Sequence, residues 1–348
     1  MKKYADRLLE YYNTHEEFIK PDYRKTEMIN NFIKPGLEDL CVTRTSFTWG
    51  VPVKSDPKHV IYVWLDALTN YITAIGYDSE NKKQFNELWP ADLHIVWKDI
   101  ARFHLIYWPI FLMALDIPLP KQILVHNWIT MKNGKMSKSV GNVIYPESLI
   151  ERYGLDATKY YLIRQMPTSS DGIFTPEEFV KRYNNDLVND LSNLLNRTVS
   201  MANKYFDGNV PEFNGNKNDV DEEYRDEAKQ TIIDFDAKIE NCDFADALQT
   251  IWNFISRSNK YIDETKPWEL AKDEAREDES KSVIYHLIAG LRHVAVLINP
   301  LLGETSENIL RQIGNKSEIS WDTLLEFEKM PTTKVIEKGE PIFMRLVE

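Results

Sequence analysis

The sequence contains very little cysteine and no long apolar run. Only Cys41 and Cys242 occur among 348 residues, far apart in the chain. This excludes a disulfide framework and a cysteine-rich zinc site. No stretch of roughly 18 or more apolar residues appears, and the N-terminus lacks the apolar core of a signal peptide. We therefore expect a protein of a reducing compartment, located in the cytoplasm and without a membrane partner.

Basic residues are also in deficit, with 42 Lys and Arg against 54 Asp and Glu, a net charge of −12. Such a balance disfavours a nucleic-acid partner. The charges are unevenly spread, however, because residues 121–140 hold four lysines and no acid, whereas residues 219–227 hold six acids. An acidic protein can still bind a polyanion where its basic residues gather.

The chain shows no internal repeat and no low-complexity tract. Its hydrophobic residues (43%) and charged residues (28%) have the proportions of an ordinary globular protein, and its length predicts two or three domains. Residues 1–50 read as a connector with two helical stretches, residues 51–170 as an α/β region, and residues 171–348 as an all-α region.

The α/β region alternates short apolar runs with helical stretches. The runs HVIYVW (59–64), LHIVW (93–97) and ILVHNWI (123–129) predict strands, and residues 65–75 and 100–115 have helical length. This order favours parallel strands buried on both faces. Three such strands leave an unpaired edge, so we expect further strands of the sheet to lie upstream.

Strand patterns end near Thr175, where a helical region begins. Thr175 followed by Pro176 and two acids is a good helix start, with the threonine as cap. Apolar residues then recur at helical spacing in 187–202 and again in 244–255. These patterns predict a bundle of amphipathic helices.

One short polar segment carries most of the chemical information. Residues 133–142, NGKMSKSVGN, place Lys135 and Lys138 three positions apart, with Ser137 between them and glycines on both sides. Such a loop can set two ammonium groups and several backbone N–H donors around a triphosphate. The alternative interpretation is a solvated basic loop.

The string KMSKS followed by xGN, placed between an α/β region and a helical region, resembles the second signature of class I aminoacyl-tRNA synthetases. The flanks YVWLDA (62–67), NYI (70–72), KDI (98–100) and RFH (102–104) resemble the methionyl-tRNA synthetases of bacteria. The likeness spans nearly the whole chain. It implies the second half of a Rossmann-like catalytic domain, followed by an anticodon-binding helix bundle.

The resemblance implies methionine–tRNA ligase activity, in which methionine is activated by ATP with Mg²⁺ and transferred to tRNA-Met. Lys135 and Lys138 then stabilise charge on the phosphates, with Ser137 in the ATP site. The family's methionine pocket is matched by Trp64, Ala67, Tyr71, Ile100, Phe103 and His104. Taken singly, each of these aromatic residues reads as a core side chain, and His104 as a structural histidine.

Three further positions are carried over from the family. Arg44 matches an arginine that assists at the reacting carboxylate and α-phosphate, while Lys98 and Asp99 match a pair near the nucleotide and ribose. A surface arginine and a helix-start ion pair are the competing interpretations. Trp97 departs from the family, because relatives commonly carry a small residue there.

The RNA-binding end is implied in the helical region. Asn189, Asn193 and Arg197 form one polar stripe at i, i+4 and i+8. Asn193 and Arg197 match the family's anticodon-contacting pair, and Pro267 with Trp268 matches its base-stacking platform. A solvated helix face is the competing interpretation of the stripe.

The family's first signature, His-x-Gly-His, is absent, as is its zinc insertion, so we expect an N-terminally truncated part of the enzyme with no metal site. We expect this chain alone not to activate methionine, which ATP–pyrophosphate exchange would test. Two other functions stay open: a catalytically silent tRNA-binding module, and a synthetase for a branched amino acid. The methionine-type pocket residues argue against the last.

Overall fold

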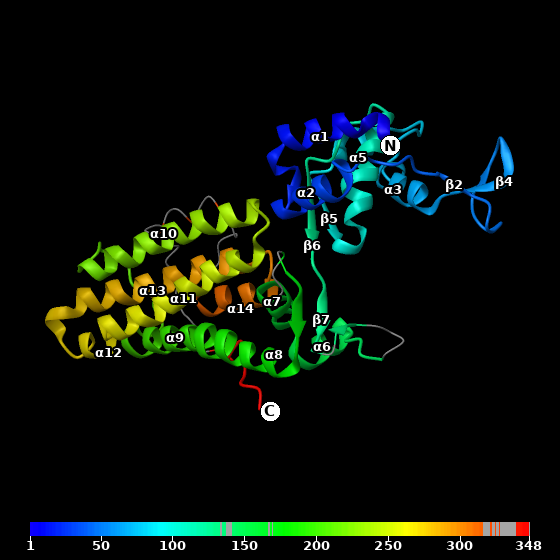
Figure 1. The fold of residues 1–348 in the computed structure, drawn as a ribbon. Coiled ribbons are helices and arrows are strands. Elements are labelled where there is room, and N and C mark those ends of the chain that lie inside the picture. Colours follow the sequence, from blue (N-terminus) through cyan, green and yellow to red (C-terminus); the bar gives the residue numbers. More distant parts are fainter. Residues whose placement is uncertain are drawn as a thin grey trace. The chain divides into compact units, whose positions relative to one another are not determined.

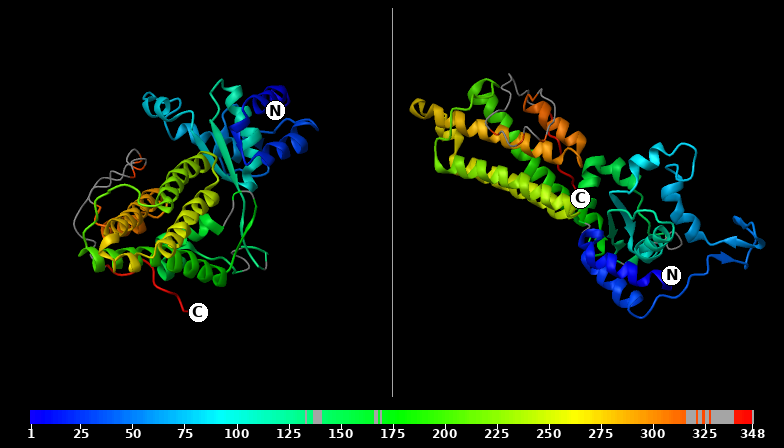
Figure 2. Two further views of the ribbon diagram at one scale, coloured as in Figure 1. Left: turned by 90° about the vertical axis from the view of Figure 1, so that its left-hand side faces the viewer. Right: turned by 90° about the horizontal axis from the view of Figure 1, so that it is seen from above.

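The computed structural model describes residues 1–132, 134–136, 141–165, 168, 170–315, 321, 324, 327 and 339–347, with Lys135 described by its backbone alone. These residues form two compact units. Unit 1 comprises Met1–Trp128 with Thr168–Ser170, and unit 2 comprises Ile129–Pro167 with Asp171–Glu348. The elements are labelled along the chain in Figure 1 and seen from two further directions in Figure 2.

A parallel sheet lies at the centre of unit 1. Its order is β1–β6–β5, formed by Ile19–Lys20, Gln122–His126 and Leu93–Trp97. The two longer strands are those that the apolar runs predicted, and their parallel pairing is confirmed. Among the described residues β5 pairs on one side only, with β6. On one face of β5, Ile95 is 60% exposed.

A second, antiparallel sheet in unit 1 has the order β2–β4–β3, formed by Thr43–Arg44, Asp56–Ile61 and Pro52–Val53. The prediction of a buried parallel strand over 59–64 is therefore wrong. Most of β4 is exposed and its chain direction reverses that of its partners. The following apolar residues begin a helix, α3 (Val63–Thr73), because burial there recurs at helical spacing, at Leu68 and Ile72.

Helices surround the parallel sheet and share one apolar core with it. The helices are η1 (Lys2–Tyr4), α1 (Ala5–Thr14), η2 (Glu16–Phe18), α2 (Asp22–Met28), η3 (Ile29–Ile33), α3, α4 (Lys83–Leu88), η4 (Lys98–Ile100), η5 (Phe103–Tyr107) and α5 (Trp108–Ala114). The helical length expected for 100–115 is met by η5 and α5, the first of which has π-type hydrogen bonding.

Unit 2 is mainly helical and begins with a small sheet, β8–β7–β9. Its strands are β7 (Ile129–Met131), β8 (Gly134–Lys135) and β9 (Gly172–Phe174). Its helices are α6 (Pro146–Tyr153), α7 (Leu155–Gln165), α8 (Pro176–Arg182), η6 (Tyr183–Ser192), α9 (Asn193–Phe206), α10 (Asp219–Glu240), α11 (Phe244–Thr265), α12 (Pro267–Leu270), η7 (Glu274–Arg276), α13 (Glu277–Ile298) and α14 (Gly303–Gln312). The helical prediction for this region is confirmed, and the Thr175 hydroxyl caps α8 by accepting from the Glu178 N–H at 3.1 Å.

Helix α13 forms the centre of this bundle, between α10, α11 and α14 (Figure 1). Its sequence is long and apolar enough to cross a membrane, yet 94% of its most apolar window is buried inside the unit, as in the core helix of a globular domain. Asp221 of α10 joins three helices, since it accepts from Tyr261 of α11 at 2.5 Å and from Ser282 of α13 at 2.8 Å. A buried carboxylate with several donors fixes the mutual placement of these helices.

Candidate functional site

Two stacked aromatic rings lie among the predicted methionine-binding residues of unit 1. Trp64 extends from the first turn of α3, and Phe103 from the first turn of η5. Their ring centroids lie 3.8 Å apart at an interplanar angle of 11°. His104 meets the Trp64 ring edge-on, with centroids 6.5 Å apart. The structure thus brings together residues that are about 40 positions apart in the sequence.

A hydrogen-bonded pair, Tyr71 and His104, supplies the polar part of this cluster. The His104 Nδ1 lies 2.9 Å from the carbonyl oxygen of Ile100, which can only accept, so this nitrogen carries the proton. The Nε2 of the neutral ring must then accept, and it takes the Tyr71 hydroxyl proton at 2.9 Å. Burial lowers the pKa of His104 and so favours the neutral ring, whereas the hydrogen bond to the Ile100 carbonyl acts in the opposite direction.

His94, which the sequence analysis did not single out, lies behind this pair. Its ring in β5 packs against Tyr71 with centroids 4.4 Å apart. Burial, with a smaller contribution from the His104 charge, lowers the pKa of His94 to about 4. Its Nε2 has no hydrogen-bond partner in the described part of the chain. A histidine inside the predicted strand 93–97 was the only available signal.

The remaining predicted pocket residues lie on the same elements. Ala67 is exposed and follows Trp64 by three positions on α3, so the two share a helix face with Tyr71. Ile100 is half-buried and packs on the core of unit 1. All six predicted pocket positions therefore belong to α3 and to the segment η4–η5.

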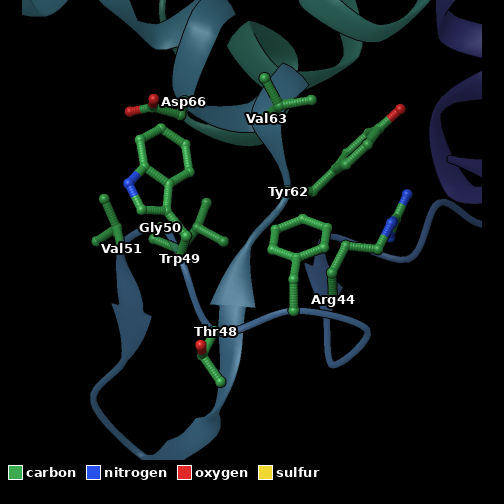
Figure 3. Close-up of a pocket in the computed structure, with 10 residues that line it drawn as sticks. Arg44, Thr48, Trp49, Gly50, Val51, Tyr62, Val63 and Asp66 are labelled. Carbon is green, nitrogen blue, oxygen red and sulfur yellow. The ribbon is translucent and has the colours of Figure 1, made fainter.

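Arg44 lies on β2 and lines a pocket of about 750 Å³, together with the loop between β2 and β3, the end of β4 and the start of α3 (Figure 3). Its guanidinium lies 3.9 Å from the Tyr62 ring centroid and donates to the carbonyls of Cys41 at 2.7 Å and Thr43 at 2.9 Å. The far wall carries Trp49, which is 87% exposed. Arginine held over an aromatic face is a preorganised anion-binding group.

Lys98 and Asp99 lie just after β5, at the carboxyl end of a parallel strand. Both contact the indole of Trp128: the ammonium lies 3.8 Å from the ring centroid, and the carboxylate accepts from the ring N–H at 2.7 Å. Neighbouring Trp97 is 44% exposed, with its ring centroid 4.2 Å from that of His126. Ligands of open α/β sheets bind at this end of the strands.

The KMSKS segment is only partly described. Gly134 and the backbone of Lys135 form β8, which pairs with β7. The Lys135 side chain, Ser137 and Lys138 lie outside the described residues, so their predicted phosphate contacts stay predictions.

The polar stripe of η6 and α9 faces away from the core of unit 2. Asn189 and Asn193 are exposed, and with Phe343 and Arg345 they line a groove of about 510 Å³. Arg345 donates to the Asn189 amide oxygen at 3.0 Å. Sequence reasoning missed Arg345, because residues 156 positions apart give no periodic signal.

Arg197, the third residue of the stripe, donates to Asp263 of α11 at 2.8 Å. The end of α11 is close to the predicted stacking platform: Lys266 adopts the left-handed conformation, and Pro267 begins α12. Pro267 is buried, whereas the Trp268 indole is 37% exposed. An exposed indole on a rigid turn is suited to base stacking.

Comparison with known proteins places these features in a family. Residues 1–199 match the family described as tRNA synthetases class I (M), which is more than half of the chain. The chain belongs to this synthetase family. Residues 221–345 also match the anticodon-binding domain of tRNA ligase. The predicted Rossmann-like class I fold followed by a helical anticodon-binding region is thereby confirmed.

Among curated relatives, the methionine–tRNA ligase of Bacillus subtilis (strain 168) is 57% identical to this chain, over 99% of the chain and 52% of the relative. The methionine–tRNA ligase of Enterococcus faecalis is 55% identical, again over 99% of the chain and 52% of the relative. The chain spans about half the length of the curated relatives it matches. The crystal structure of Mycobacterium tuberculosis methionyl-tRNA synthetase bound by methionyl-adenylate is similar, with a TM-score of 0.91, 37% identity, and coverage of 99% of this chain and 67% of that one.

Proposed function

We propose that this chain is part of a methionine–tRNA ligase of cytoplasmic protein synthesis. In the proposed reaction a carboxylate oxygen of methionine bonds to the α-phosphorus of ATP and pyrophosphate leaves. A ribose hydroxyl at the 3′ end of tRNA-Met then attacks the acyl carbon and releases AMP. Mg²⁺ enters with ATP as part of the substrate. Unit 1 would contribute the amino-acid pocket, and unit 2 the KMSKS loop and the RNA-reading helices.

The observation that carries the proposal is the cluster of contacting side chains Trp64, Phe103, Tyr71 and His104. A methionine side chain is unbranched and polarizable, and its sulfur interacts well with aromatic edges while forming only weak hydrogen bonds. The stacked rings offer such edges. The Tyr71 hydroxyl and the His104 Nδ1–H already donate hydrogen bonds within the protein. A ligand bound beside them therefore need not supply a strong hydrogen-bond acceptor.

The charged residues complete the proposed chemistry. Lys135 and Lys138 would neutralise the departing pyrophosphate, with Ser137 beside them. Lys98 and Asp99 would hold the nucleotide, and Arg44, preorganised over Tyr62, would approach the reacting carboxylate.

RNA recognition would use Asn189, Asn193 and Arg197 for base edges and Trp268, on its Pro267 turn, for stacking. Asn and Arg make paired hydrogen bonds to unstacked bases, such as those of an anticodon loop. The match of residues 221–345 to an anticodon-binding domain supports this assignment for Pro267 and Trp268.

Two binding measurements test the proposal on the 348-residue chain. Calorimetric titration should show methionine binding, with leucine binding at least about tenfold weaker, and H104A should reduce this preference. Gel-shift titration should show binding of tRNA-Met that is lost when its anticodon is replaced. Binding of tRNA without methionine would instead support the silent tRNA-binding module, and binding of neither would overturn the proposal.

A further inference from the structure

The carboxyl end of β5 carries an exposed indole that the proposed function does not assign. Trp97 is the last residue of the strand, and its side chain is 44% exposed. In the register of the sheet it lies opposite His126, the last residue of β6. The two ring centroids are 4.2 Å apart at an interplanar angle of 55°. The imidazole therefore supports the indole from one side.

The groups next to Trp97 are those that recognise a nucleotide. Lys98 carries an ammonium group and Asp99 an exposed carboxylate, and both are positioned by the Trp128 indole. An ammonium suits phosphate oxygens, a carboxylate suits ribose hydroxyls, and an indole face suits a base. All these residues belong to unit 1 and lie at the end of the sheet where such ligands bind.

We propose that Trp97 is a stacking residue for the nucleoside of ATP, braced by His126 and placed beside the phosphate and ribose contacts of Lys98 and Asp99. This inference rests on the proposed function and adds a residue to its nucleotide site.

Ile95 provides an internal control for this proposal. It lies two residues before Trp97 on the same face of β5 and is more exposed, at 60%. If this face of β5 served only to pack against other polypeptide, replacing either Ile95 or Trp97 would change stability, and neither replacement would specifically change nucleotide affinity. A stacking role predicts that only Trp97 affects the binding of a ligand that has a base.

The test measures the affinity of the 348-residue chain and its variants for two ligands by calorimetric titration: ATP with Mg²⁺, and inorganic tripolyphosphate, which has no base. We expect W97A to weaken ATP binding about fivefold or more, since base stacking on an aromatic residue contributes on the order of 1–3 kcal/mol. W97F should stay within about twofold of the parent because it keeps an aromatic face. Tripolyphosphate affinity should be unchanged in W97A, W97F and I95A.

Three results would overturn the inference: an unchanged ATP affinity in W97A, an equal loss for tripolyphosphate, or an equal loss of ATP affinity in I95A. Absence of ATP binding by the parent chain would do so as well. Methionine titration of W97A shows whether the variant is folded and separates this inference from the proposed function. If W97A binds methionine and its ATP affinity is unaltered, only the stacking role of Trp97 is refuted. If the parent chain binds neither methionine nor tRNA-Met, the proposed function itself is refuted.

Discussion

Replacing Gly290 by alanine should strongly destabilise unit 2. Gly290 lies in the middle of α13, and a Cβ there would overlap the hydroxyl of Tyr224 and lie 3.0 Å from its Cζ. Tyr224 is fully buried, stacks on Tyr261 with centroids 4.5 Å apart, and shares a hydrogen bond of 2.8 Å with Ser258. The side chain has no space to retreat without disturbing these contacts.

Three terms determine the size of the effect. Overpacking a core costs about 1–3 kcal/mol, and breaking the buried Tyr224–Ser258 hydrogen bond costs about 1–3 kcal/mol. Alanine restores about 1 kcal/mol through its higher helix propensity. The free energy of unfolding should therefore fall by roughly 3 kcal/mol, a large share of the ~5–15 kcal/mol that holds a typical domain.

Urea unfolding followed by circular dichroism measures this change, and G303A is the matched control because a Cβ at Gly303 meets nothing within 4 Å. Y224F removes the overlapping oxygen, so G290A should cost clearly less in the Y224F background than in the parent. Ser258 keeps a second bond, to the Phe254 carbonyl at 2.8 Å, and tolerates this change. A G290A protein as stable as the parent, or a cost that Y224F leaves undiminished, would refute the reasoning.

Three further predictions concern the candidate sites. The pKa of His94 is lowered to about 4, so as pH falls below about 6.5 the unfolded chain takes up a proton at this histidine before the folded chain does. The free energy of unfolding should therefore decrease by up to ~3 kcal/mol between pH 6.5 and pH 4 because of this residue. Urea unfolding at pH 7.5 and 4.5 measures the decrease, and H94Q should abolish the part due to His94. Y71F leaves the His104 Nε2 without its donor and should cost about 1–3 kcal/mol and weaken methionine binding, whereas Y77F, at a half-buried tyrosine, should change neither. W268A should weaken tRNA-Met binding about fivefold or more in gel-shift titration at unchanged thermal stability, and W268F should retain most of the affinity.

Local patterns predicted the elements whose periodicity is unambiguous. The strand over 93–97 and the cap at Thr175 are where the sequence indicates, because a short apolar run and a capping residue are local signals. The expected burial of that strand on both faces is wrong, since Ile95 and Trp97 are exposed on one face. The strand over 59–64 failed because a short apolar run does not distinguish a buried strand from the first turn of a helix such as α3. Burial of α13 on all sides follows from packing against other helices rather than from its own pattern.

The candidate site shows the same limit. Family likeness pointed to Tyr71 and His104 separately, but only the folded chain shows that one donates to the other and which tautomer results. Arg345 gave no local signal, and His94 gave only its place in the predicted strand 93–97, since each gains its neighbours from distant segments. The roles of these residues in binding and catalysis stay predictions until the variants are measured.

The one-sided pairing of β5 has a practical consequence. Along its other side the described residues supply no ladder partner for its backbone amides and carbonyls. Such an unpaired edge can pair with a strand of another molecule, and the exposed Ile95 adds apolar surface beside it. Concentrated preparations of this polypeptide should therefore self-associate through unit 1, and a charged substitution at Ile95 should delay the resulting turbidity.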